Sequence, residues 1–298
     1  MSTPPLARGL WGVLATPFTG SGYAVDTESL RREVRLYTNI PASGLVVLGV
    51  FGEGAALDTG EQALTVRTVR EEAGATPIVV GLSARSTNVA IEQARTAVDA
   101  AGGNLAALMV QANTPDPEAL SAHLHAIHQA TGAGIVLQDY PVASGVKVST
   151  PQLLAAIGKC PFIAAVKSEA PPTAAAIAQL TAKIDIPVFG GLGGVGLIDE
   201  LAAGAAGAMT GFSHPEALQL AITAYQDGGF RAARDVFAPW LPLANFEGQP
   251  GIGLALRKEI LKRRGIIAEA LVRPPAPTLP AELSAMIDAH LDAVKELA

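Results

Sequence analysis

A lysine stands at the end of an apolar run in the stretch "FIAAVKSEA", residues 162–170. Residues 162–166 predict a buried strand, and Lys167 follows them directly. Burying an ammonium group is costly unless the group is paired or neutralised. A neutral lysine amine in a dry pocket attacks the carbonyl carbon of a ketone or aldehyde and forms a Schiff base. A plainer interpretation, in which Lys167 reaches solvent or pairs with Glu169, stays open at this point.

Short apolar runs recur along the chain and alternate with helical patterns. These runs are continuously apolar rather than alternating, which is typical of parallel strands covered on both faces. The expected strands are 12–18, 44–49, 77–82, 105–110, 134–139, 162–167, 186–191 and 207–211. The expected helices are 27–39, 60–73, 86–101, 117–130, 150–158, 172–183, 195–203 and 214–227.

The helix starts carry capping signals. Asp26, Asp58 and Thr150 stand just before helical patterns, and Pro151 suits a first helical turn. Serial strand–helix units without an internal linker predict an α/β protein with the (β/α)8 TIM barrel fold. In that fold the active site lies at the carboxyl ends of the strands, which is where Lys167 ends the sixth expected strand.

The chain divides into two expected parts. Residues 1–228 predict the barrel, and residues 229–298 predict a C-terminal helical region of two or three helices on its outside. The proline-rich stretch "RPPAPTLP" (273–280) is expected to be a rigid, extended connection before the last helix.

Composition limits the class of protein. Hydrophobic residues make up 49% of the 298 residues and charged ones 16%, which argues against disorder. No apolar run approaches the roughly 20 residues of a membrane span, and the start lacks the layout of a signal peptide. One cysteine, Cys160, fits a reducing cytoplasm. A net charge of −6 argues against nucleic acid and anionic membranes as partners, and the basic run "RKEILKRR" (257–264) is expected to be a solvated helix face.

Several motifs together resemble one enzyme family. "GVLATPF" (12–18), "GVFGE" (49–53), Lys167 after the sixth strand and "GQPGIGLALRKEILKRRG" (248–265) occur in a familiar order. They resemble the dihydrodipicolinate synthase and N-acetylneuraminate lyase family of class I aldolases, over nearly the whole chain. The resemblance implies a barrel with a C-terminal helical region, a homo-oligomer (tetramer or dimer), and a Schiff base between Lys167 and a 2-oxo acid, commonly pyruvate. Neither a cofactor nor a metal ion is expected.

The loop after the second strand departs from the family pattern. The family usually places two hydroxyl residues between the glycines, whereas this chain has Val50 and Phe51 between Gly49 and Gly52. The glycines and Glu53 remain, so the turn is expected to offer its backbone amides to the substrate carboxylate.

The stretch after the fifth strand, "LQDYPVASG" (137–145), also departs from the pattern. Gln138 stands where the family has its proton-transfer tyrosine, and Ala143 stands where the synthase has a substrate-binding arginine. Tyr140 comes two residues after Gln138 and would point the same way if the strand continued. It is either a displaced phenol or, as we favour, a packing residue. The tyrosine that reaches a neighbouring subunit in the synthase has no counterpart in "VQANTPDP" (110–117).

Two further motifs admit more than one interpretation. "GGLGG" (190–194) after the seventh strand could bind phosphate through its amides. The resemblance instead makes Gly191, together with Met209 on the eighth strand, part of the keto-acid pocket. "HLHAIH" (123–128) lies on an outer helix and is expected to be a solvated face rather than a metal site.

The expected function is therefore a Schiff-base lyase, an aldolase or dehydratase, acting on a 2-oxo acid such as pyruvate or a sugar-derived keto acid. The losses at Val50, Phe51, Gln138 and Ala143 predict that it is not the lysine-pathway synthase. Lys167 would be the nucleophile, and Gln138 or a bound water would replace the phenol. The alternatives are a catalytically lapsed barrel that binds a small acid and a phosphate-binding barrel enzyme.

Overall fold

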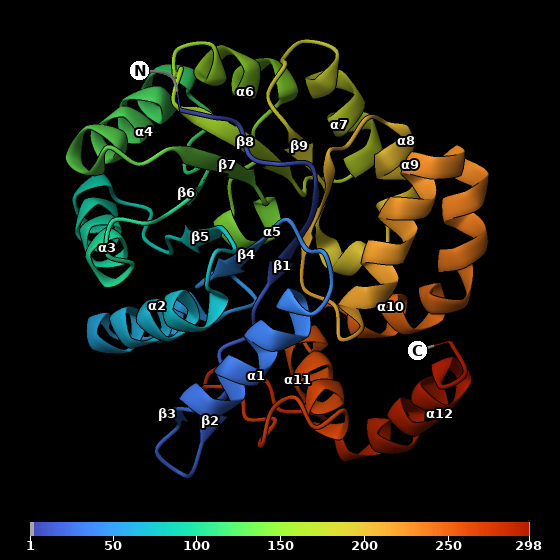
Figure 1. Ribbon diagram of the computed structural model, residues 1–298. Coiled ribbons are helices and arrows are strands. Elements are labelled where there is room, and N and C mark those ends of the chain that lie inside the picture. Colours follow the sequence, from blue (N-terminus) through green and yellow to red (C-terminus); the bar gives the residue numbers. More distant parts are fainter. Residues whose placement is uncertain (1–2, 298) are drawn as a thin grey trace.

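A computed structural model describes residues 3–297 and shows a parallel barrel surrounded by helices (Figure 1). Its sheet has the order β10-β1-β4-β5-β6-β7-β8-β9. A parallel bridge between Gly190 and Ala208 joins the two outermost strands, so the barrel is nearly closed. The strands are β1 (Gly9–Val13), β4 (Gly44–Val47), β5 (Ile78–Gly81), β6 (Ala107–Gln111), β7 (Ile135–Asp139), β8 (Ile163–Ser168), β9 (Val188–Phe189) and β10 (Gly207–Thr210).

The predicted α/β barrel is confirmed, with one strand misplaced. The run 12–18 was expected to be the first strand, but β1 ends at Val13. The Ala15 amide donates to the buried Glu33 carboxylate (2.8 Å) instead of to a neighbouring strand, so the chain leaves the sheet there. Two short antiparallel strands follow outside the barrel, β2 (Phe18–Thr19) and β3 (Ala24–Val25).

Helices follow the strands in the predicted order, with one short helix, α5 (Pro141–Ser144), that was not predicted. They are α1 (Thr27–Thr38), α2 (Thr59–Ala73), α3 (Thr87–Ala100), α4 (Pro117–Thr131), α5 (Pro141–Ser144), α6 (Thr150–Ile157), α7 (Thr173–Thr181), α8 (Leu197–Ala202) and α9 (Pro215–Phe237). Asp26 caps α1 and Asp58 forms a capping box with Glu61 at α2, as expected. The cap of α6 is Ser149 and not Thr150, which is already the first helical residue.

The C-terminal region adds α10 (Leu241–Glu247), α11 (Gly253–Arg263) and α12 (Ser284–Val294) outside the barrel (Figure 1). The expected boundary at 228/229 falls within α9, at a kink where Gly229 has φ 69°. The prediction of a solvated face for 257–264 is wrong for its first two residues. Arg257 bonds to the buried Glu247 (2.9 Å), and Lys258 is fully buried against Glu53, so both charges are paired inside.

Most of the apolar core lies in two layers of side chains. One fills the barrel interior and includes Trp11, Val46, Val79, Val136 and Met209. The other lies between the strands and the surrounding helices and extends into the C-terminal helices. The interior layer fills the barrel below its mouth, so a substrate can enter only from the side where the strands end.

Other expectations concern the outer helices. On α4, His123 is buried and its Nδ1 lies 3.0 Å from the Thr87 hydroxyl, so the predicted solvated face is wrong for this residue. His128 stacks on Phe162 with 4.1 Å between ring centroids. None of the helices described between residues 3 and 297 combines the length and hydropathy needed to cross a membrane.

Candidate active site

A row of polar side chains crosses the carboxyl ends of three neighbouring strands. The register pairs Gln111 on β6 with Gln138 on β7, and Gln138 with Lys167 on β8. Neighbouring parallel strands lie about 4.8 Å apart, so these three residues stand at one level of the barrel. Gln138 and Lys167 are buried. The structure therefore brings together the predicted nucleophile and the residue at the family tyrosine's place.

Glu169 completes this row. Its Oε2 lies 3.2 Å from Lys167 Nζ and accepts a hydrogen bond of 2.7 Å from Gln138 Nε2. The Leu192 amide donates to the other carboxylate oxygen (3.2 Å). All three partners are donors, so the carboxylate is held as an acceptor against the lysine. The plainer interpretation of Lys167 named this contact, but it missed that the contact is fully buried and shared with Gln138.

The glycine-rich segment after β9 makes room for Glu169. A Cβ at Gly191 would overlap the Glu169 carboxylate, so any other residue would push that side chain away from Lys167. The next residues form a short 3-10 turn, η2 (Leu192–Gly194). Its Gly193 amide donates to the Thr210 hydroxyl (2.8 Å), while the Leu192 amide is used by Glu169. Two amides that a phosphate would need are therefore occupied by the protein's own oxygens.

The turn after β4 keeps the shape that its glycines predict. Leu48 and Glu53 lie in the left-handed region, with φ of 59° and 52°. A Cβ at Gly52 would come within 3.0 Å of the Leu14 carbonyl, so this position needs glycine. Glu53 accepts from Lys258 Nζ and from the Arg273 amide (2.9 Å), which fastens the turn to the C-terminal region. The hydrogen bonds described for the turn do not use the amides of Val50 and Phe51.

The two apolar replacements in this turn have different surroundings. Phe51 packs against the barrel-interior layer, and the Arg257 guanidinium lies 4.5 Å above its ring. Val50 is 47% exposed and lines the mouth. Where the family usually has two hydroxyl residues, this turn therefore has Phe51 packed against the barrel interior and Val50 exposed at the mouth.

A cavity of about 430 Å³ opens at this mouth. It reaches Gln138, next to Lys167 in the row, and is also lined by Gly49, Val50 and Gln111. Farther out, residues of three other segments line it: Ser83, Arg85, Ala143, Arg273, Pro275 and Ala276. The proline-rich stretch 273–280, expected only as a connection, therefore contributes a wall of the cavity.

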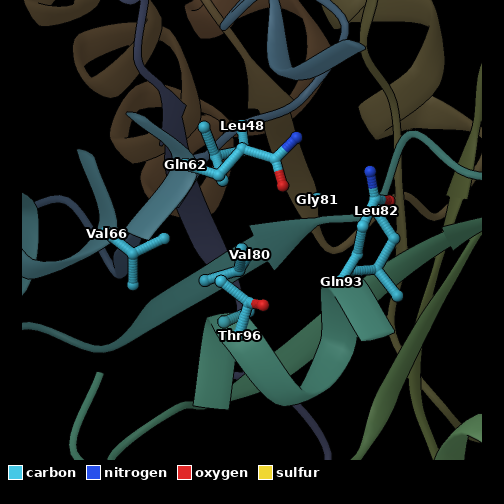
Figure 2. A pocket seen from close by; sticks show the side chains of 9 residues that line it. Leu48, Gln62, Val66, Val80, Gly81, Leu82, Gln93 and Thr96 are labelled. Carbon is cyan, nitrogen blue, oxygen red and sulfur yellow. The ribbon is translucent and has the colours of Figure 1, made fainter. Parts of the chain in front are cut away.

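A second, much smaller cavity lies beside β5, between α2 and α3 (Figure 2). Its volume of about 10 Å³ is the space of a single water at most. Leu48, Gln62, Val66, Val80 and Gln93 are among the side chains around it, and its lining includes no charged group (Figure 2). This void has neither the size nor the chemistry of a substrate site.

The remaining expected site residues lie apart from the row. Tyr140 is half-buried at the start of α5, where φ −134° and ψ 82° end the strand, so it does not continue the alternation of β7. Burial, with a smaller effect of the Glu169 charge, raises the pKa of its phenol. Met209 is fully buried in the barrel-interior layer, where its amide donates to Gly190 (2.9 Å).

Two buried carboxyl groups lie near Glu169 but outside the row. Burial and the charge of Glu169 raise the pKa of Asp139 to about 6. Burial also raises the pKa of Glu200 to about 7, with smaller effects of the charges on Glu169 and Asp199. A Cβ at Gly190 would overlap the Glu200 carboxylate, so Glu200 lies directly behind the glycine-rich wall of the site.

Glu169 is the functional candidate that sequence reasoning did not include among the catalytic residues. Its signal was the spacing: it stands two residues after Lys167, and side chains two apart on an extended segment lie on the same side. Arg85 had no comparable signal, because it belongs to a different loop from the motifs that carry the resemblance.

Comparisons with known proteins agree with this geometry. The model of the Dihydrodipicolinate synthetase family matches residues 6–294. The L-2-keto-3-deoxyarabonate dehydratase of Azospirillum brasilense is 31% identical, over 93% of this chain and 91% of its own. A 4-hydroxy-tetrahydrodipicolinate synthase of Corynebacterium aurimucosum is 30% identical, over 85% of this chain and 83% of its own. The crystal structure of the dihydrodipicolinate synthase of Rhodopseudomonas palustris superimposes with a TM-score of 0.89 at 27% identity, over 98% of this chain and 99% of that one. The chain belongs to the dihydrodipicolinate synthetase family, whose members are enzymes of the lyase and aldolase type.

Proposed function

We propose that this protein is a Schiff-base lyase that acts on a 2-oxo acid, with Lys167 as the nucleophile. The observation that carries the proposal is the buried contact of 3.2 Å between Lys167 Nζ and Glu169 Oε2 at the barrel mouth. A nucleophile within hydrogen-bond reach of a base, which is itself oriented by a third group, is the arrangement of an activated nucleophile. Here the third group is Gln138.

The first half of the reaction uses Lys167 and Glu169. The amine adds to the C2 carbonyl of the substrate while Glu169 accepts the proton that the lysine releases. The resulting carbinolamine loses water and becomes a protonated imine. The free amides of the turn at Val50 and Phe51 are placed to hold the substrate carboxylate, as donors to a charged acceptor.

In the second half, Glu169 takes over the role of the family's phenol. Removal of the proton at C3 of the imine gives an enamine, whose electrons then expel the C4 hydroxyl as water. In an aldol cleavage the base instead takes the proton of the C4 hydroxyl of the imine, the C3–C4 bond breaks, an aldehyde leaves, and the remaining enamine is protonated at C3 to give the final imine. Hydrolysis of the final imine by water returns the free Lys167. Gln138 has no proton to give at neutral pH, so its amide positions Glu169 by donating to Oε2.

The size of the mouth favours a substrate longer than pyruvate. A cavity of about 430 Å³ is in the range, about 300–1,000 Å³, of pockets that enclose whole small-molecule ligands. The relative named as a dehydratase of a keto-deoxy sugar acid supports the same class. We therefore favour dehydration of a sugar-derived 2-oxo acid over the synthase reaction, for which Val50, Phe51 and Gln138 lack proton-shuttling groups.

Borohydride trapping tests the proposal. Pyruvate or a longer 2-oxo acid plus borohydride should add one reduced imine mass to the peptide that contains Lys167. Lys167→Ala should abolish the adduct, and Lys183→Ala, at an exposed lysine on the surface, should retain it. Glu169→Gln should slow adduct formation by roughly 10²–10⁴, the usual effect of losing a general base. Absence of any adduct across a panel of 2-oxo acids would contradict the proposal.

The two alternatives are less well supported. A phosphate bound at 190–194 would need backbone amides of this segment. The amides of Leu192 and Gly193 already donate hydrogen bonds to Glu169 and Thr210. A lapsed barrel that only binds a small acid would have no use for a buried carboxylate against Lys167, whose desolvation is costly. Trapping without turnover on any 2-oxo acid would favour the lapsed barrel.

A further inference from the structure

We infer that Arg85 recognises the distal end of the substrate and that this end carries a carboxylate. The inference rests on the proposed function and names its substrate class, a 2-oxo dicarboxylic acid. Three features support it: the position of the Arg85 guanidinium, the absence of a partner for it among residues 3–297, and the pairing of the other charges around the cavity.

Arg85 extends across the mouth from one loop to another. It belongs to the loop between β5 and α3 and lines the same cavity as Gln138 and Ala143. Its Nη2 would be 3.4 Å from a Cβ placed on Gly145, the residue that ends α5. The guanidinium thus lies beside the segment where Ala143 has replaced the arginine expected from the resemblance. Gly145 has no side chain, so the Arg85 guanidinium can lie against its backbone.

The guanidinium of Arg85 has no hydrogen bond or ion pair with any residue between 3 and 297. Only its backbone is held, because the Asn113 side-chain amide donates to the Arg85 carbonyl (2.8 Å). The other cation that lines the cavity, Arg273, is already paired. Arg273 binds both carboxylate oxygens of Glu61 (2.6 and 2.8 Å) and also donates to the Ala56 carbonyl (2.8 Å).

The acidic side chain that lines the cavity is also neutralised. Glu53 accepts from Lys258 Nζ and from the Arg273 amide. Lys167 and Glu169, which lie beside Gln138 in the row, pair with each other. Among the described residues that line the cavity, Arg85 is therefore the charged side chain without a partner. An anionic group is the ligand that its planar, five-donor fork recognises best. A substrate with its 2-oxo group at Lys167 would place a terminal carboxylate toward Arg85.

The test compares two acids that differ only at the distal end. 2-Oxoadipate ends in a carboxylate, and 2-oxohexanoate ends in a methyl group on a chain of equal length. Borohydride trapping over a concentration series gives the half-saturating concentration of each. We expect the wild type to favour 2-oxoadipate about tenfold, the lower end for a hydrogen bond to a charged group, because Arg85 is exposed. The preference should weaken as salt is added.

Variants separate Arg85 from general effects. Arg85→Gln should reduce the preference to within about twofold, while Arg85→Lys should keep part of it. Arg95→Gln is the matched control, since Arg95 is exposed on α3 and pairs with Glu92 (2.9 Å) away from the cavity. It should keep the full preference.

The outcomes distinguish this inference from the proposed function. Adducts at Lys167 without any preference for 2-oxoadipate, or with a preference that survives in Arg85→Gln, would overturn the inference and leave the Schiff-base proposal intact. A wild type that forms no adduct with either acid or with pyruvate would overturn both.

Discussion

Glu200 gives the enzyme a pH-dependent stability that one substitution should remove. The side chain is 1% exposed, and neither carboxylate oxygen accepts a hydrogen bond among the described residues. Burial raises its pKa from 4.5 to about 7, although the nearby Thr173 hydroxyl acts in the opposite direction. Folded Glu200 therefore holds its proton up to about pH 7, whereas the unfolded carboxyl releases it near pH 4.5. Between these values the folded state binds more protons, so the free energy of unfolding falls as the pH rises.

The magnitude follows from the two pKa values. At about 1.4 kcal/mol for each tenfold change, ionisation of Glu200 costs about 3 kcal/mol once the carboxyl is ionised in both states. Most of this loss, about 2–3 kcal/mol, falls between pH 5 and pH 8. Glu200→Gln has the same shape without the charge. Its free energy of unfolding should exceed that of the wild type by an amount that grows by about 2–3 kcal/mol over this range.

Urea unfolding at pH 5, 6, 7 and 8 measures the difference directly. Other buried acids with a raised pKa, such as Glu33 at about 8, act on both proteins alike and cancel in the comparison. Glu282→Gln makes the same chemical change at an exposed position and should keep the wild-type pH dependence. Parallel pH profiles for the wild type and Glu200→Gln would refute the reasoning, because they would show that Glu200 is ionised in the folded state at every pH tested.

Three other results are expected. Gly191→Ala should slow imine formation by about 10² or more, since its Cβ would displace Glu169 from Lys167; trapping rates measure this, and Gly22→Ala, at an exposed glycine whose Cβ would meet no neighbour, serves as the comparison. Turnover of pyruvate with aspartate semialdehyde should be negligible in a direct assay, because Gln138 cannot relay a proton as a phenol does; a rate of about 1–10³ per second would contradict this. Light scattering at micromolar concentration should give a homo-oligomer, as the family resemblance implies, and a strictly monomeric mass would count against it.

Much of the barrel could be predicted from local patterns. Continuous apolar runs of strand length fixed the strands to within a few residues, apart from β1, because a parallel strand must bury both faces. Asp26 and Asp58 marked helix starts through a bond that involves only the next turn of chain. Lys167 at the end of such a run was already the predicted nucleophile, since its position on the strand is set by neighbours in sequence.

The contacts that define the site depend instead on segments far apart in the chain. Glu169 meets Gln138 because β7 and β8 pair in one register, and it fits only because Gly191 comes from the next strand of the barrel. Arg85 reaches the neighbourhood of Gly145 only once the barrel has closed.

The basic run 257–264 was predicted to be solvated because the prediction considered only its charge. The stretch 257–264 is polar enough to be solvated, and nothing near it in sequence shows that Arg257 and Lys258 have buried carboxylates to pair with. By itself, therefore, the sequence determined the barrel, its caps and the lysine, because strand burial and capping are satisfied within a few neighbouring residues. Only the tertiary structure decided which charges are paired inside and which cation is left free at the mouth, because charge pairing depends on distances that long-range folding sets.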